Sequence, residues 1–287
     1  MLKSCIDKSI NEFLYSYRTR CINELATLAY FHLFFFDILK DNLICCGIRL
    51  ERKTIVSNHI DKSPILKFTS NKNEICCELG DLFLVCKSDN SQKGIAIQAK
   101  NNSQSYTSQS TKNEILLYSN WPKFRIKKPK IDSYEYVLKN KIDSISRFLT
   151  FFPNINGEFK IGDAINQNID FSDFLMELLS PNNNTGRLFR TSKQLRVLKL
   201  KRLLDKIAGL KHHFFKESFD DWDLLCNRIM VYFEYRQFKN INTGLNNKQK
   251  ITDLCFISGT PPETLDKIIE KITEYEFFSL IKLSYNN

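Results

Sequence analysis

The sequence lacks the signals that direct a chain into or across a membrane. No amino-terminal stretch combines a basic flank, a short apolar core and a small-residue cleavage site. The longest apolar run, LAYFHLFFFDIL, is interrupted by His32 and Asp37, so it does not read as a membrane span. We therefore expect a cytoplasmic protein that has no membrane partner.

Sulfur and imidazole patterns that hold metals are also missing. The nine cysteines contain no CxxC pair, and most of them lie within apolar runs, where a free cysteine behaves as a small hydrophobe. The four histidines lack the spacing of metal ligands. The sequence therefore predicts reduced thiols in a core rather than disulfides or a zinc site.

Positive charge is in excess, and it is local. The formal net charge is +10, and the segment from Arg187 to Lys216 holds ten Lys or Arg but only one acid, Asp205. A second cluster, KFRIKKPK, holds five basic residues between Lys123 and Lys130. Such clusters are typical of phosphate binding, and a solvated helix face is the alternative. The candidate nucleic-acid contacts are Arg187, Arg190, Lys193, Arg196, Lys199, Arg202, Lys206, Lys123, Arg125, Lys127 and Lys128.

Apolar periodicity predicts a helical start, a run of strands and then mostly helices. Helical spacing extends from Ile10 to Leu39. Strand-like runs separated by turn residues follow at 43–50, 54–60, 65–70, 74–86 and 94–100. Later helices are expected before Trp121–Pro122, at 172–179, from 192, at 220–238 and at 262–277. These patterns predict a helical start followed by a largely antiparallel sheet in 1–130, and a mostly helical region in 131–287.

The stretch ELGDLFLVCKSDNSQKGIAIQAK, residues 78–100, predicts a hairpin that gathers polar side chains on one face. A turn centred between Asn90 and Ser91 sets Asp81 opposite Lys100. Strand side chains alternate, so Gln98 projects from the same face. A cross-strand salt bridge is the simplest interpretation of Asp81 with Lys100.

The same face also suits a divalent cation. Asp81 would be the anionic ligand of Mg²⁺ or Mn²⁺, and Gln98 and the carbonyl of Ala99 would add oxygen ligands. Lys100 would orient the attacking water and offset charge on phosphate oxygens. Glu78 is a further metal candidate if Gly80 introduces a bulge.

Asp81 followed by Gln98-Ala99-Lys100, after an amino-terminal helix, resembles the QxK variant of the PD-(D/E)xK restriction-endonuclease-like superfamily. The segment LLYSNWPKF adds a resemblance to uncharacterised bacterial defence-type proteins. The resemblance implies an α/β (α+β) fold with a restriction-endonuclease-like core, in which helices flank a central mixed sheet. It also implies a metal-dependent nuclease that acts on nucleic acid, DNA in preference to RNA, and a role in anti-phage or anti-plasmid defence. It also implies a glutamate from the first helix, for which Glu24 is the best match and Glu12 the substitute.

Two departures from this pattern leave other functions open. Gly80 stands where the superfamily commonly has proline, and Gln98 replaces the usual acid. A nucleic-acid-binding module whose catalytic site has decayed is one alternative. Another is an interaction protein whose basic helix docks on an acidic partner or a membrane surface. A homodimer, or a subunit of a defence complex, is compatible with each.

Overall fold

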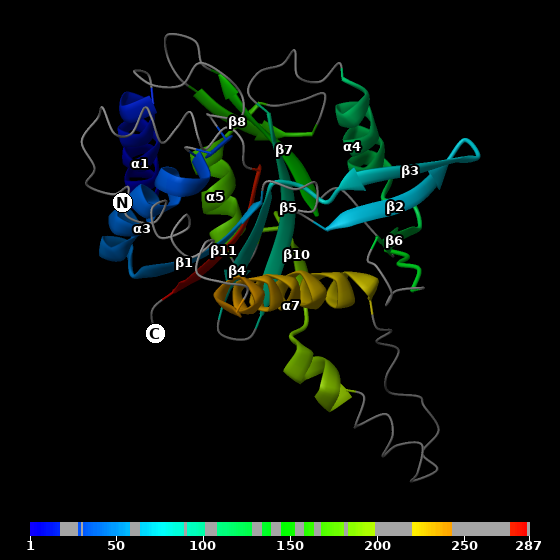
Figure 1. Ribbon diagram of the computed structural model, residues 1–287. Helices are drawn as coiled ribbons and strands as arrows, with labels where there is room; N and C mark the ends of the chain where they lie inside the picture. The colour runs from blue at the N-terminus through cyan, green and yellow to red at the C-terminus, as the bar shows by residue number, and fades with distance from the viewer. Residues whose placement is uncertain are drawn as a thin grey trace.

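The computed structural model describes residues 1–17, 28–29, 31–57, 64–88, 91–100, 108–127, 134–138, 145–152, 158–163, 168–180, 183–198, 220–242 and 276–285. Within these residues the chain forms a large mixed sheet with helices on both faces and a small second sheet at one side (Figure 1). The predicted central mixed sheet flanked by helices is confirmed.

Eight strands of the described residues build the large sheet, in the order β1-β11-β4-β5-β7-β8-β9, with β10 paired to β5. Their bounds are β1 Ile48–Ser57, β4 Leu82–Lys87, β5 Gln92–Lys100, β7 Ser146–Phe152, β8 Glu158–Gly162, β9 Ile169–Asp170, β10 Arg187–Phe189 and β11 Glu276–Tyr285. The sheet is mixed because β11 runs parallel to β4 and β7 parallel to β5, whereas the other pairs are antiparallel. Strands β7 to β11 come from 131–287, so that region contributes strands that the sequence analysis did not predict.

The small antiparallel sheet has the order β3-β2-β6. Its strands are β2 Ile65–Ser70, β3 Asn73–Glu78 and β6 Phe124–Ile126. Alternate residues of β2 and β6 are buried, as expected for strands with one solvated face. By contrast β4 is buried from Leu82 to Cys86, because the large sheet is covered on both faces.

Helices cover the two faces of the large sheet separately (Figure 1). One face carries α1 Leu2–Tyr17, α3 Phe36–Leu43 and α5 Phe171–Leu179, together with the π-helical segment η1 Phe31–Phe35 and the 3-10 turn η2 Ile44–Cys46. The other carries α4 Gln109–Asn120 and α7 Asp221–Asn242. A further helical segment spans 192–198. No helix among the described residues is long and apolar enough to cross a bilayer.

Two apolar clusters mark the same division of the sheet. Alternate residues of β4 and β5, such as Leu82 and Ile97, pack with α1, α3 and α5 in the first cluster. Their neighbours Phe83 and Ala96 pack with α4, α7 and the small sheet in the second. Residues on the same side as Phe83 and Ala96 therefore face α4.

The structure corrects two of the predicted elements. The run expected as a strand at 43–50 begins with helical residues, and strand β1 starts only after Gly47, which ends η2 in the left-handed conformation with φ +67°. The helix expected at 262–277 falls largely outside the described residues, but Glu276 and Phe277 belong to β11. Helices α4, α5 and α7 confirm the predictions for those segments.

Candidate active site

The β4–β5 hairpin places Asp81 opposite Gln98, not opposite Lys100. The strands pair Leu82 with Ile97, and the register continues to Lys87 opposite Gln92. Beyond that pair, the Ser88 N–H donates to the Ser91 carbonyl at 2.9 Å, which centres the turn one residue earlier than predicted. Moving the centre by one residue shifts the pairing by two, so the predicted face is retained.

The carboxylate of Asp81 closes the end of the hairpin ladder. Its Oδ2 accepts hydrogen bonds from Gln98 Nε2 and from the Ala99 N–H, the latter at 2.9 Å. The Asp81 backbone N–H donates to Ile97, and its carbonyl accepts from the Ser279 N–H of β11 at 3.0 Å. Asp81 is 1% exposed. Contacts to both neighbouring strands therefore fix this aspartate in one position.

Gln98 presents an oxygen that no described residue satisfies. The side chain is 5% exposed, and its Oε1 is buried without a hydrogen-bond partner among the described residues. Leaving a buried acceptor unpaired costs about 1–3 kcal/mol. Such a cost is recovered if a ligand or cation takes the oxygen as a partner. The amide nitrogen is already engaged with Asp81, so Oε1 is the atom available to that partner.

Lys100 forms its ion pair with a residue that the sequence analysis did not select. Its Nζ lies 2.8 Å from Glu114 Oε2, and the two side chains are 10% and 8% exposed. Glu114 comes from α4, which packs on the face of the hairpin that carries Gln98 and Lys100. The predicted cross-strand pair of Lys100 with Asp81 is therefore replaced by a strand-to-helix pair.

A signal for Glu114 was present in the sequence. Thr111, Glu114, Leu117 and Tyr118 are the buried residues of α4. They follow the helical spacing of three and four residues, so an acid occupies the stripe that should be apolar. A buried carboxylate needs a partner. An acid within an otherwise apolar helical stripe was therefore the sequence signal that pointed to Glu114.

Tyr118 and Gly80 pack closely against the backbone beside Asp81. The Tyr118 hydroxyl donates to the Leu79 carbonyl at 2.6 Å. Burial raises the pKa of Tyr118 well above its usual value, and the charges of Glu114 and Asp81 add to the shift, so the phenol stays a neutral donor. A Cβ on Gly80 would lie 2.6 Å from the Tyr118 hydroxyl and 2.8 Å from the Ile97 carbonyl, and Gly80 has a φ of +150°. Glycine before Asp81 is therefore required by packing.

These donors suit a hard divalent cation. Asp81 and Glu114 supply carboxylate oxygens, and Gln98 supplies the buried Oε1. An oxygen-only set is what Mg²⁺ and Mn²⁺ prefer. Glu114 is a second buried carboxylate on this face, and its Oε2 pairs with Lys100. Ala99 contributes its N–H to Asp81, and Glu78 ends β3, where its charge raises the pKa of Tyr118.

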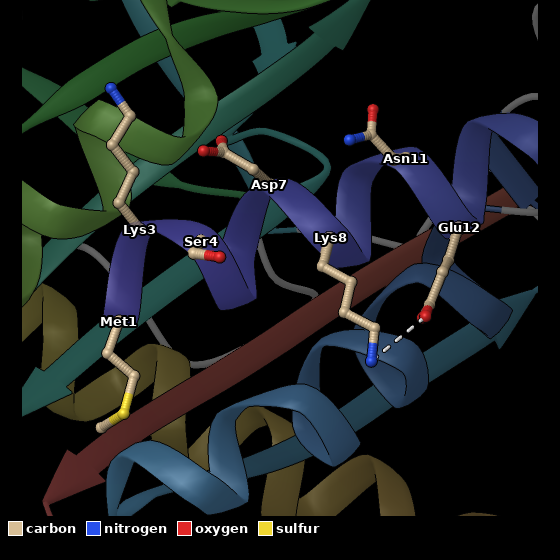
Figure 2. A pocket seen from close by; sticks show the side chains of 7 residues that line it. All are labelled: Met1, Lys3, Ser4, Asp7, Lys8, Asn11 and Glu12. Atoms are coloured by element: carbon tan, nitrogen blue, oxygen red, sulfur yellow. Dashed lines mark ion pairs between the residues drawn. The ribbon is translucent and has the colours of Figure 1, made fainter.

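Of the two acids expected from the first helix, Glu24 lies outside the described residues, and Glu12 does not join the site. Glu12 is an exposed residue of α1, where it accepts from Asn42 at 3.0 Å and lies 3.6 Å from Lys8. Figure 2 shows it in an open hollow along α1, lined by Met1, Lys3, Ser4, Asp7, Lys8, Asn11 and Glu12. That helix packs on the face of the sheet opposite to α4, so Glu12 is not a substitute ligand.

Two of the predicted nucleic-acid contacts hold the fold together. Arg187 pairs with Asp220, and its carbonyl accepts from Trp222 Nε1 at 3.2 Å. Arg190 Nη1 lies 3.5 Å from Asp223, whose carboxylate also accepts the Arg190 N–H at 2.7 Å. These contacts dock β10 and the residue after it against the start of α7. The charge count missed them because both acids lie just beyond Lys216.

Other predicted contacts are exposed where the structure describes them. Lys193 and Arg196 lie on the helical segment 192–198. Lys123, Arg125 and Lys127 alternate along the exposed side of β6 and its flanks, with Arg125 Nη2 3.8 Å from Glu135. Lys128, Lys199, Arg202 and Lys206 lie outside the described residues. Five basic side chains are thus displayed on the described surface.

No family model, no curated protein and no solved structure matches this chain. The function is therefore inferred from the geometry and chemistry of the site.

Proposed function

We propose that the chain is a metal-dependent nuclease of the PD-(D/E)xK type that hydrolyses phosphodiester bonds in nucleic acid, with DNA favoured over RNA. One observation carries the proposal: Asp81, the unpartnered Gln98 Oε1 and the Lys100–Glu114 pair converge on one face at one end of the β4–β5 hairpin. A buried group of this composition is costly unless it serves a ligand. Metal-dependent phosphodiester hydrolysis would use each of these four side chains.

The proposed roles follow from the donor types. Asp81, Gln98 and Glu114 would hold Mg²⁺ or Mn²⁺, with the Ala99 carbonyl as the fourth candidate. When bound, such a cation lowers the pKa of a water nucleophile and polarises a phosphoryl oxygen. Lys100 would orient that water and offset the charge that develops on the phosphate. Before substrate arrives, Glu114 neutralises Lys100 and so keeps the ammonium tolerable in a buried position.

Substrate binding is assigned to the exposed basic residues. Each Lys or Arg that contacts a phosphate contributes to a salt-dependent affinity. Lys193 and Arg196 are exposed and Lys123, Arg125 and Lys127 form a second exposed group, whereas Arg187 and Arg190 are engaged by acids. A cytoplasmic role in bacterial defence against phage or plasmid DNA, as a homodimer or with a partner subunit, is the setting that the sequence resemblance suggests.

The decisive test is a cleavage assay with matched lysine variants. Single-stranded DNA, double-stranded DNA and RNA would be incubated with the intact chain and Mg²⁺ or Mn²⁺, with and without a chelator. Asp81→Asn and Lys100→Ala should abolish cleavage. Lys87→Ala is the matched control, because Lys87 is an exposed lysine at the other end of the same hairpin. Cleavage that survives in both site variants, or that needs no metal, would rule the proposal out.

A nucleic-acid-binding module without catalysis is the second candidate. Two observations favour it: Gln98 replaces an acid, and Lys100 is already neutralised by Glu114. In that case the intact chain would bind nucleic acid but cleave none of the substrates with either metal. Binding should weaken steeply as salt rises, and Lys193→Ala with Arg196→Ala should reduce the slope by about 2. Cleavage by the intact chain would eliminate this candidate.

A further inference from the structure

Cys5 and the adjacent pair Cys45 and Cys46 meet on the side of the sheet opposite to the candidate active site. Cys5 lies in α1, and Cys45 and Cys46 lie in the η2 turn between α3 and β1. The Sγ atom of Cys5 is 3.4 Å from each of the other two, which are 3.9 Å from each other. Among the described residues, no other group of three or more His, Cys, Asp or Glu side chains brings its ligand atoms within 4.8 Å of one another.

These cysteines contradict the expectation of core thiols. Cys77, Cys86 and Cys226 are buried as predicted, but Cys45 is exposed and Cys5 and Cys46 are half-buried. Packing of small hydrophobes therefore does not account for a cluster at the surface. Its three thiols instead meet one another, and the Cys45 thiol also donates to the Asn42 carbonyl at 3.2 Å.

The spacing of the three sulfurs is that of ligands around one ion. A zinc–thiolate bond is about 2.3 Å long, so neighbouring sulfurs of a tetrahedral site stand about 3.8 Å apart. The observed separations of 3.4, 3.4 and 3.9 Å differ from this by a few tenths of an ångström at most. Side-chain torsions alone can absorb such a difference.

We propose that Cys5, Cys45 and Cys46 form a binding site for a thiophilic metal ion, Zn²⁺, with solvent as the fourth ligand. The exposure of Cys45 leaves that fourth position open to water. Thiolates select soft or borderline ions over Mg²⁺, so this site and the oxygen site at Asp81 would bind different metals. The two sites lie on opposite faces of the sheet and act independently.

Zn²⁺ binds thiolates rather than thiols, so the thiol protons of the three cysteines pass to solvent when the ion binds.

Metal binding would connect α1 to the end of α3. Cys5 and Cys45 are 40 residues apart, and the intervening chain includes η1 and α3. An ion that binds only the folded chain stabilises it in proportion to the logarithm of its free concentration. We therefore expect Zn²⁺ to stabilise the packing of α1 against α3.

The test uses the full-length chain stripped with a chelator and reloaded with Zn²⁺ alone. Elemental mass spectrometry after removal of free metal should find one Zn²⁺ per chain. Co²⁺ as a probe should give a thiolate-to-metal charge-transfer band. Both signals should be lost in Cys45→Ser and Cys46→Ser. Cys76→Ser is the matched control, because Cys76 is an exposed cysteine on β3 and should keep the metal.

Thermal unfolding gives a second, independent readout. Zn²⁺ should raise the unfolding midpoint of the intact chain and of Cys76→Ser, and leave that of Cys45→Ser unchanged. Stoichiometric Zn²⁺ in Cys45→Ser, or none in the intact chain, would overturn the proposal. Because Asp81→Asn should still bind Zn²⁺, failure of the nuclease assignment does not affect this result.

Discussion

Removal of both partners of the Lys100–Glu114 ion pair should destabilise the chain by less than the two single removals added together. The two charges are 2.8 Å apart and about nine-tenths buried. At an effective dielectric constant of about 20, their attraction is about 6 kcal/mol, most of which offsets the cost of taking both charges out of water. Lys100→Met or Glu114→Gln alone leaves one buried charge without its partner.

The magnitude follows from that imbalance. Each single substitution should lower the free energy of unfolding by about 3–5 kcal/mol. The double variant buries no charge at this position, so it should lose much less than the sum of the two. A coupling free energy of about 2–3 kcal/mol is expected for residues in direct contact.

Urea denaturation of the four chains in a double-mutant cycle measures this coupling. The matched control is the Lys8–Glu12 pair on α1, which is 3.6 Å apart with side chains 64% and 46% exposed (Figure 2). That exposed pair should give a coupling of about 0.3–0.5 kcal/mol. A coupling for Lys100 and Glu114 no larger than the control would refute the reasoning. The double variant also separates stability from chemistry, because it should fold yet cleave nothing.

Three further changes test the packing around the sheet. Gly80→Ala should cost about 2 kcal/mol or more in urea unfolding, since the added Cβ meets backbone and side chain at a positive φ; an unchanged midpoint would contradict this. In a timed alkylation followed by peptide mass spectrometry, exposed Cys76 should react rapidly while Cys77, whose pKa burial raises to about 12, stays unmodified in the folded chain; equal rates would count against it. Burial lowers the pKa of Lys93 in the folded chain below the usual 10.5, so as pH rises the folded chain loses this proton before the unfolded chain does. The folded chain should therefore gain stability relative to Lys93→Met as pH rises from that lowered pKa to 10.5. Stability–pH profiles that run parallel for the two chains would disprove this prediction.

The sequence predicted those helices and strands whose pattern is complete within a short stretch of the chain. The apolar stripe of α7 and the polar turn of the β4–β5 hairpin are both read over short windows. The face shared by Asp81, Gln98 and Lys100 was also predictable, because alternation survives a two-residue error in register. The register itself depended on where the turn closes, at Ser88 and Ser91, and several polar residues there made more than one choice plausible.

Partners brought in from distant segments could not be predicted in the same way. Strand β11 is buried from Phe277 to Ile281, so it lacks the alternation that marks a half-exposed strand. Lys100 meets Glu114 only because α4 packs back on the sheet. Arg187 and Arg190 looked available for phosphate until the fold brought their acids to them. The cysteine cluster was missed for the same reason, since Cys5 is 40 residues from Cys45.

The candidate active site depends on residues from both predicted regions of the chain. Asp81 lies in 1–130, yet its carbonyl accepts the N–H of Ser279 from β11, which lies between β1 and β4. Lys100 likewise ends a strand whose outer neighbour is β7, through the pairing of Lys100 with Thr150. Because both residues adjoin strands from the second region, residues 1–130 alone lack two of the strands that fix the site. The segment that carries the sequence motif is therefore smaller than the unit that positions it.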